Sequence, residues 1–387
     1  MIGLGQVGAL GRGLGLTPIK GGASLARMLF GNGENGFLFY PASDLTRLFT
    51  TSTGPTNVAA NDDPAGLWLS NSSWNGMTYA QLMAAQSDLT TDGEFTSGSN
   101  WTASGGWAVS GGKAVHTAGS TGSVTQAFSP VVGALYLVEY EVSGWTTGTA
   151  YPYFSGGTTS FGNVVGANGV ITCFLVGNSG NSAFGFFAQT STYNGSIERV
   201  SLKRVLGNHA LNATSTQRPL YKTNSGKPYL NFDGTDDRLV SPFIPTTAGT
   251  VAAAFRASNA SAIAIGGGTS TGNKRLRIGL DASGVPKIVF NASSDIVIGA
   301  SDARNADTII ALTWDATGWE AWLNGVLVAS AATAPLMDGT GNGCAIGSLE
   351  GGTSAYLSGR VYTALGTNDR VTPSEIARIT TDFTRLF

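Results

Sequence analysis

Glycine is the residue that most limits what this chain can fold into. The 387 residues include 55 glycines, which punctuate short runs of alternating apolar and polar residues. Glycine accepts the positive φ of tight turns but weakens helix interiors, so the pattern favours many short strands joined by turns. Charged residues make up only 12% of the chain, against roughly a quarter in ordinary soluble domains. We therefore predict an all-β fold.

The length and the spacing of the strand-like runs predict two domains. A chain of 387 residues exceeds the usual size of one domain, and 42% hydrophobic residues suffice for two cores. Alternating runs separated by Gly and Ser turns recur over residues 87–204, and the same texture returns from about 205 to 387. This spacing is typical of antiparallel β-sandwiches.

The last third of the chain contains the clearest local signals. Three strands are expected over Thr308–Trp314, Trp319–Leu323 and Val326–Ser330, with Asn324-Gly325 as the turn of the second hairpin. A helix is expected from Pro373 to about Arg385, because Thr372 and Glu375 form a capping box around an N-terminal proline. One face of this helix is apolar and is expected to dock against a sheet.

Residues 1–30 are too rich in glycine for a core of their own, and only Ala23–Phe30 is expected to form a short helical turn. Apolar residues spaced by glycine become ordered by packing on a neighbouring subunit. The segment is therefore interpreted either as an arm that attaches the protein to an assembly or as a floppy tail.

Charge and cysteine content argue against several partners. The formal net charge is −2 and no basic run occurs, so neither nucleic acid nor an anionic membrane surface is an expected partner. No apolar stretch reaches the roughly 18 residues of a membrane helix, which argues against membrane insertion. Cys173 and Cys344 lie far apart and outside any CxxC pair, so we expect them to be buried as small hydrophobic residues.

Three phrases in the last section resemble concanavalin A-like jelly rolls of the laminin-G type. They are the strand and turn Lys227–Leu239, the hairpin sequence WLNGVLV, and the strand Leu357–Tyr362 followed by the Thr-Pro-Ser-Glu-Ile helix start. The resemblance covers residues 205–387. It implies two curved antiparallel sheets, and it includes both glycan-binding and purely structural members.

The segment Phe39–Leu69 resembles the lead-in of tailed-phage virion proteins of this lectin-like type, where it runs directly into a phrase like Gly207–Thr214. Here a long segment separates the two phrases, so we predict an insertion. The predicted organisation is an N-terminal virion-attachment arm over 1–30, a concanavalin A-like domain over 31–75 plus 205–387, and an inserted sandwich over 76–204.

The inserted segment resembles galactose-binding-like jelly rolls, which include carbohydrate-binding modules. The likeness lies in Asp92–Phe95, in GGWAVSGGKAV, and in the strand Gly195–Leu202. It implies a structural Ca²⁺ held by Glu94 and Glu198, although the family usually has Asp at the second place. The alternative is a pair of ordinary surface carboxylates. The acidic stretch Asp233, Asp236 and Asp237 is interpreted as a tight turn.

Tryptophan rings are the glycan-binding candidates, because aromatic faces stack on sugar rings. The candidates are Trp101, Trp107 and Trp145 in the inserted segment and Trp322 in the last section. Trp319 and Trp322 face opposite sides of one strand, so one is expected in the core and the other exposed. Core packing is the alternative for each of them.

No catalytic constellation stands out, and we expect a protein that is not an enzyme. His116 is expected on a strand surface and His209 in a turn, and no GxSxG motif occurs. Glu139 and Glu141 are expected on the outward face of one strand, without the central acid of a glucanase site.

These features together favour a structural protein of a phage particle. The first expectation is a tail fibre, spike or tail-associated adhesin that contacts host glycans, located in the virion and forming homo-oligomers such as trimers. The alternatives are a capsid decoration or head-fibre protein, a prophage-encoded bacterial lectin, and a polysaccharide depolymerase. The expected partners are other virion proteins, contacted through the arm, and host surface glycans.

Overall fold

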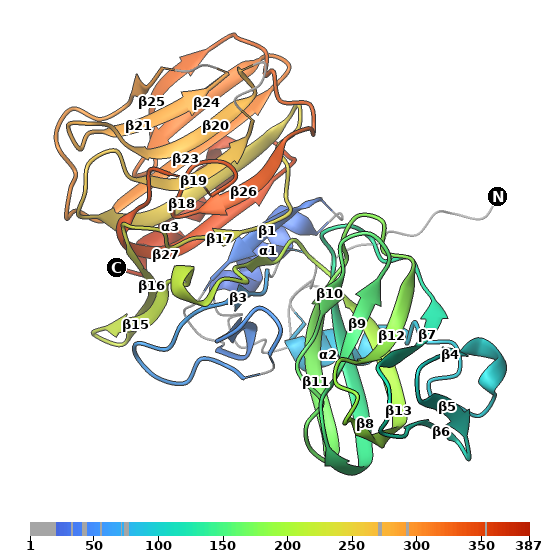
Figure 1. The fold of residues 1–387 in the computed structure, drawn as a ribbon. Coiled ribbons are helices and arrows are strands. Elements are labelled where there is room, and N and C mark those ends of the chain that lie inside the picture. The colour runs from blue at the N-terminus through green and yellow to red at the C-terminus, as the bar shows by residue number, and fades with distance from the viewer. Residues whose placement is uncertain are drawn as a thin grey trace, which may run out of the picture.

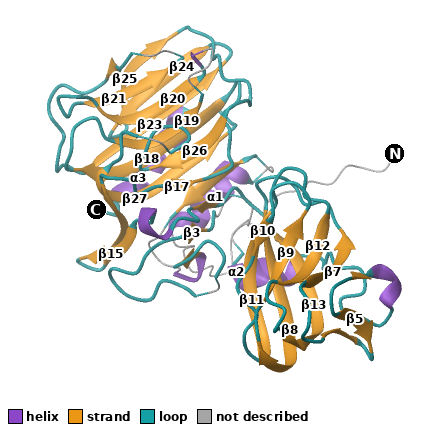
Figure 2. Cartoon of the chain, viewed as in Figure 1, coloured by secondary structure: helices purple, strands orange, loops and turns teal. Residues whose placement is uncertain are grey.

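The computed structural model describes residues 21–387 except 32–33, 41–44, 55, 71, 73–76, 270–272, 292–293 and 353. The predicted all-β class is confirmed: antiparallel sheets form two sandwiches, and helices are few and short (Figure 2). Figure 1 shows the two sandwiches as separate lobes, with the guest sandwich in cyan and green beside the larger host sandwich. We call them host and guest because the chain enters and leaves the guest between two neighbouring host strands.

The host sandwich consists of sheets A and B. Sheet A has the order β15 (Leu220–Asn224), β16 (Lys227–Asp233), β27 (Ser358–Thr367), β18 (Gly249–Ala257), β23 (Thr308–Asp315), β24 (Gly318–Leu323), β25 (Val326–Ala331). A further strand, β1 (Gly36–Phe39), also pairs with β27. Sheet B has the order β2 (Leu48–Phe49), β3 (Leu67–Trp68), β14 (Ala210–Leu211), β17 (Leu239–Val240), β26 (Asn342–Ile346), β19 (Ile263–Gly268), β20 (Arg275–Leu280), β21 (Pro286–Phe290), β22 (Ile296–Val297).

The guest sandwich consists of sheets C and D. Sheet C has the order β10 (Ser160–Phe161), β9 (Ala150–Ser155), β12 (Ala183–Ala188), β7 (Gly122–Ala127), β4 (Thr102–Ala103). Sheet D has the order β11 (Gly169–Val176), β8 (Leu135–Thr147), β13 (Asn194–Val205), β6 (Lys113–His116), β5 (Trp107–Ser110). Because β3 pairs directly with β14, through Trp68 and Ala210, the host sheet continues across the point where the guest leaves and returns.

Each sandwich has its own core, as the alternation of the strands dictates. The host core lies between sheets A and B and includes Phe232, Phe255 and Trp314, all at most 1% exposed. The guest core includes Tyr136, Phe154 and Phe184. Cys173 lies in the guest core and Cys344 in the host core, both as free thiols, which confirms their expected burial.

Two helices cover part of the outer face of sheet A. α3 (Pro373–Thr384) has the predicted Thr372–Glu375 capping box, and α1 (Gly21–Phe30) extends the turn predicted over Ala23–Phe30. Both helices share one apolar cluster with sheet A, made of residues including Leu25, Leu29, Ala252, Tyr362, Ile376 and Phe383. Residues 25–30 thus pack as part of the host sandwich, so an attachment arm would end before them; residues 1–20 lie outside the described residues.

A further helix and an apolar cluster join the two sandwiches. The helix α2 (Tyr79–Ala85), capped by Thr78 and Gln81, lies at the start of the inserted segment. Its Leu82 and Met83 pack with host residues Phe49, Leu67 and Leu69 and with guest residues Leu135, Phe174 and Val205, which we call the junction cluster. No described helix is long and apolar enough to cross a membrane.

Candidate functional site

The candidate site is a group of aromatic side chains on the outer face of sheet C. In β9, alternation directs Pro152 and Phe154 inward and Tyr151 and Tyr153 outward. In β12 the same alternation buries Phe184 and Phe186 in the core and leaves Gly185 and Phe187 on the outer face. The edge strand β10 adds Phe161. We call Tyr151, Tyr153, Phe161 and Phe187 the aromatic face.

Strand register brings these four rings together. Phe161 lies opposite Tyr153, and their rings stack at 5.9 Å with an interplanar angle of 11°. Tyr151 lies opposite Phe187 on the neighbouring strand. Phe161 also contacts Tyr151 edge-on at 5.7 Å, and Phe187 lies 5.8 Å from Tyr153. The result is one continuous aromatic surface over three strands.

The aromatic face reaches solvent without a covering element. Phe161 is 44% exposed, Tyr151 and Phe187 are half-buried, and Tyr153 forms the floor at 8% exposure. A contiguous exposed group of aromatic rings is a candidate binding surface. Neither tyrosine hydroxyl has a protein hydrogen-bond partner among the described residues, so both remain available to a ligand.

Gly185 lies beside the rings at a closely packed position of the sheet. It lies between Tyr153 on one neighbouring strand and Thr125 on the other. A Cβ built at Gly185 would meet the Val124 carbonyl oxygen at 1.9 Å, so no larger residue fits without moving the backbone. Beyond the glycine, Thr125 is half-buried and Thr102 is exposed, so hydroxyl groups flank the rings. The surface combines apolar rings with polar hydroxyls.

The opposite side of the guest is the one that contacts the host. The outer face of sheet D carries Leu135 and Phe174 into the junction cluster, where the Phe174 ring meets Phe49 at 5.0 Å. The Phe174 amide donates to the Thr53 carbonyl at 2.9 Å, and the Thr53 hydroxyl bonds to Asn163 at 2.9 Å. The guest is therefore anchored through the outer face of sheet D and through Asn163, just after β10, while the aromatic face lies on the outer face of the opposite sheet C.

Three of the four predicted glycan-binding tryptophans are core residues, which corrects the expectation for them. Trp101 and Trp107 are each 5% exposed, and their indole N–H groups donate to the Asp92 and Gly122 carbonyls. Trp322 is 9% exposed, because α1 and α3 cover the sheet face that sequence alone leaves open. Trp319, also buried, packs in the host core. A sugar cannot stack on these rings.

Trp145 differs from the other three. It is half-buried at the end of β8, its indole N–H donates to the Gly148 carbonyl at 3.0 Å, and its amide N–H donates to Asn168 at 2.8 Å. Part of its ring packs on the guest core. It belongs to sheet D and not to the aromatic face on sheet C, and its role in glycan binding stays a prediction.

The predicted calcium ligands do not form a shared group. Glu198 bonds to Lys113 at 2.6 Å and to the Ser143 hydroxyl, and these contacts lower the pKa of the Glu198 carboxyl. Glu94 lines a separate depression with Glu139 and Arg199. Among the described residues, neither glutamate belongs to a group of three possible metal ligands. A carboxylate already paired with an ammonium group is poorly suited to hold Ca²⁺.

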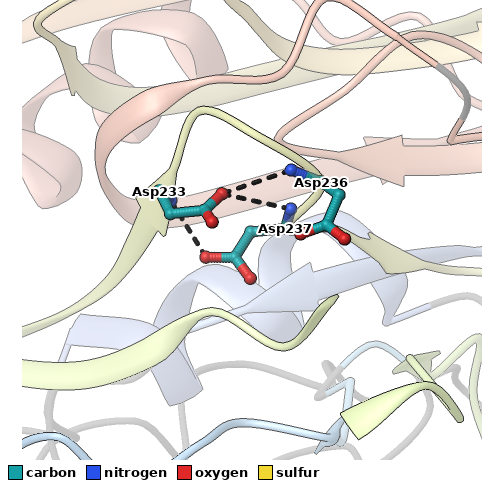
Figure 3. Close-up of side chains that lie close together, drawn as sticks. All are labelled: Asp233, Asp236 and Asp237. Carbon is teal, nitrogen blue, oxygen red and sulfur yellow. Dashed lines mark hydrogen bonds between the residues drawn. The ribbon is translucent and has the colours of Figure 1, made fainter. Parts of the chain in front are cut away.

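The acidic stretch after β16 forms the expected tight turn (Figure 3). Asp233 Oδ1 accepts the backbone N–H of Thr235 at 2.8 Å, of Asp236 at 3.3 Å and of Asp237 at 3.4 Å. The Asp233 amide in turn donates to Asp237 Oδ2 at 2.9 Å. Burial and the neighbouring carboxylates raise the pKa of Asp237 to about 7. The carboxylates satisfy the backbone of their own loop.

Neither histidine has catalytic surroundings. His116 is only 1% exposed, contrary to the expected strand surface, because Trp107 and Tyr193 enclose its ring at 5.0 and 5.4 Å. His209 is buried among backbone groups. Glu139 and Glu141 face outward as expected, and both pair with Arg199.

No protein-family model matches the chain, and no curated protein sequence matches it. The similar solved structures include the CBM40 of Ruminococcus gnavus IT-sialidase bound to α2,3-sialyllactose, with 16% identity over 35% of this chain and 83% of that chain and a TM-score of 0.30. Domain 4 of AbnA, a GH43 extracellular arabinanase from Geobacillus stearothermophilus in complex with arabinotriose, matches with 14% identity over 42% and 81% and a TM-score of 0.34.

Trypanosoma rangeli sialidase matches with 15% identity and a TM-score of 0.34, over 46% of this chain and only 30% of that chain. Carbohydrate-binding modules are thus among the structural neighbours. Similarity at this level does not establish a shared function.

Proposed function

We propose that this protein is a non-enzymatic glycan-binding protein and that the aromatic face of the guest sandwich is its binding surface. The observation that supports the proposal is the uncovered cluster of Tyr151, Tyr153, Phe161 and Phe187 on the outer face of sheet C. Pyranose rings present apolar C–H faces that pack on aromatic rings, while the sugar hydroxyls need polar neighbours. The tyrosine hydroxyls and Thr125 supply such neighbours.

An open face of this kind favours binding over hydrolysis. Glycoside hydrolysis needs two carboxyl groups flanking the scissile bond. None of the four rings has a carboxylate beside it in the register of β9, β10 and β12, whose residues around the rings are apolar or hydroxylic. A ligand would lie along the strands and remain chemically unchanged.

The experiment is a glycan array followed by calorimetry with the full chain. Phe161→Ala and Tyr151→Ala are each expected to weaken binding about tenfold, because one lost ring contact is worth about 1–1.5 kcal/mol. Leu327→Ala removes a similarly exposed apolar side chain from the host edge strand β25 and is expected to leave affinity unchanged. Equal affinity of all three variants and the parent protein would refute the assignment of the site.

We further propose that the binding serves a phage particle, as a tail fibre, spike or tail-associated adhesin. The support is the likeness of Phe39–Leu69 to phage lead-in segments together with the glycine-rich N-terminus. A capsid decoration, a bacterial lectin and a depolymerase are the competing roles. Antibody-gold labelling of purified particles distinguishes them: label at the tail supports the adhesin, label over the head supports the decoration, and unlabelled intact particles contradict a virion role.

A further inference from the structure

A second surface feature lies on the host, on the part of sheet A that no helix covers. α1 and α3 pack over the outer face as far as Tyr229 and Tyr362. Beyond these two rings the face opens into a groove of about 410 Å³. The groove is lined by polar side chains and glycine with one buried ring below, namely Asn231, Phe232, Asp233, Arg256, Ser258, Asn305, Ser358, Gly359 and Arg360.

One of the two arginines in the groove is already neutralised. Arg256 Nε and Nη2 donate to the two carboxylate oxygens of Asp307 at 2.8 and 2.5 Å. The Tyr362 hydroxyl donates to the same carboxylate at 2.8 Å. Burial alone would raise the pKa of Asp307, but the hydrogen bonds from Arg256 and Tyr362 and the nearby positive charges outweigh it and lower the pKa. The carboxylate therefore stays ionised. Arg256 therefore lines the groove with its charge already paired to Asp307.

Arg360 is held in place without a carboxylate partner. Its guanidinium carbon lies 4.7 Å from the centre of the Tyr229 ring, which holds the charge by a cation–π contact. Among the described residues Arg360 forms no ion pair, although its charge interacts with the Asp307 carboxylate. In Asp233, which also lines the groove, Oδ1 accepts amides of its own turn. An ordered guanidinium with free donors is prepared to bind an anion in the bidentate manner.

The rest of the groove suits hydroxyl groups. Asn231 and Asn305 offer amide groups, and Ser258 and Ser358 offer hydroxyls that already bond to each other at 2.9 Å. At Gly359 a Cβ would meet the Arg256 carbonyl oxygen at 2.1 Å, so only glycine fits there and no side chain rises from this part of the groove. The ring of Phe232 is 1% exposed and belongs to the core below, so the groove has no apolar pocket for a peptide side chain.

We propose that this groove binds an acidic sugar residue, with Arg360 receiving its carboxylate and the amides and hydroxyls receiving its hydroxyl groups. The proposal deepens the glycan-binding function and rests on it, but it uses a separate site on the other sandwich. The chain thereby has one surface for the apolar faces of sugars and another for a charged sugar.

The test uses uronic-acid trisaccharides built from galacturonate, glucuronate or mannuronate, each paired with its carboxyl-reduced neutral counterpart. Calorimetry with the full chain is expected to show at least about tenfold preference for one acidic trisaccharide over its neutral counterpart, since a charge-assisted hydrogen-bond pair is worth at least about 1.4 kcal/mol. Arg360→Gln is expected to abolish this preference. Arg360→Lys keeps the charge but loses the planar fork, and it is expected to retain only part of the preference.

Arg204→Gln is the matched control, because it removes the same charge from an exposed position on guest strand β13. It should keep the preference, and thermal unfolding should confirm that all variants are folded. The absence of any acidic preference in the parent protein, or a preference that survives Arg360→Gln, would overturn the proposal. Phe161→Ala separates the two proposals: it should weaken the binding of neutral trisaccharides at the aromatic face and leave the Arg360-dependent binding of the acidic ones, whereas Arg360→Gln should weaken the acidic ones alone.

Discussion

The side chain of His209 holds together the two chain segments that connect the guest to the host. Its Nδ1 accepts the backbone N–H of Ser70 at 3.0 Å, which requires that nitrogen to be unprotonated. Its Nε2 lies 3.2 Å from the Val205 carbonyl and donates to it. The neutral ring thus joins Ser70, two residues after β3, to Val205, the last residue of β13. Protonation would place two N–H groups against each other.

The stability of the protein should therefore decrease in mild acid through His209. Burial lowers the pKa of this imidazole from 6.5 to about 4, so between these values the unfolded chain binds more protons than the folded one. The contribution is fully present above about pH 6.5 and is lost towards pH 4, with a slope of up to ~1.4 kcal/mol per pH unit. Urea unfolding of the parent and of His209→Asn over this range measures it; an identical slope in both would contradict the assignment.

Asp237 should produce a dependence of the opposite sign. Its pKa is raised from 3.8 to about 7, so the folded state holds a proton that the unfolded state releases. This contribution is present below about pH 4 and is lost as the pH rises to 7. Asp237→Asn keeps an acceptor for the Asp233 amide and should be more stable than the parent at pH 8, by about 1–3 kcal/mol. At pH 4 the two should unfold alike; a constant difference across the range would rule out titration of Asp237.

The site residues show what sequence reasoning could and could not find. The residue type most associated with sugar stacking, tryptophan, was the wrong guide for Trp101, Trp107 and Trp322. Their large apolar rings are buried in the hydrophobic clusters instead. The actual surface rings come from strands that are distant in sequence, and only register unites Phe161 with Phe187. A signal was present in the Tyr-Pro-Tyr-Phe sequence of β9, where alternation sends both tyrosines to one side.

At the scale of elements, local signals predicted structure well where turn or cap chemistry was explicit. The hairpins around Asn324-Gly325 and the helix after Thr372 form with ends within one or two residues of expectation. The guest strands Gly169–Val176 and Ala183–Ala188 lie in the stretch 87–204, where the alternating runs predict strands. The docking of α3 on a sheet was expected from its apolar face, and the structure confirms it. The packing of α1 beside α3 was not predictable, because it depends on tertiary contacts between distant parts of the chain.

The capping box of α3 should contribute measurably to the stability of the host. The Thr372 hydroxyl accepts the Glu375 amide at 3.3 Å, and the Glu375 carboxylate accepts the Thr372 amide at 2.7 Å. Thr372→Ala should lower the free energy of unfolding by about 1 kcal/mol. Thr381→Ala, an exposed change within the same helix, should cost less. Chemical denaturation compares them, and equal effects would show that the cap is not the cause.

At the scale of the whole molecule, the junction cluster should make the two sandwiches unfold together. Phe174 lies on the outer face of β11, is 1% exposed, and reaches host residue Phe49 rather than the guest core. Phe174→Ala should cost about 3–5 kcal/mol and should split one calorimetric transition into two. Val170→Ala, on the same face of the same strand but 54% exposed, should change little. A single undivided transition in Phe174→Ala would place the coupling elsewhere.

The ends of the guest lie beside each other in the folded chain. The Leu89 amide donates to the Leu202 carbonyl at 2.8 Å, and the Val200 amide donates to the Gly93 carbonyl at 2.8 Å. Host strands β3 and β14 meet just outside this point, so the backbone requires only that an inserted unit begin and end at adjacent positions. This geometry would allow one inserted domain to be exchanged for another during evolution. A replacement module could bring a new specificity without disturbing the host, provided it offers an apolar counterpart to Phe49, Leu67 and Leu69.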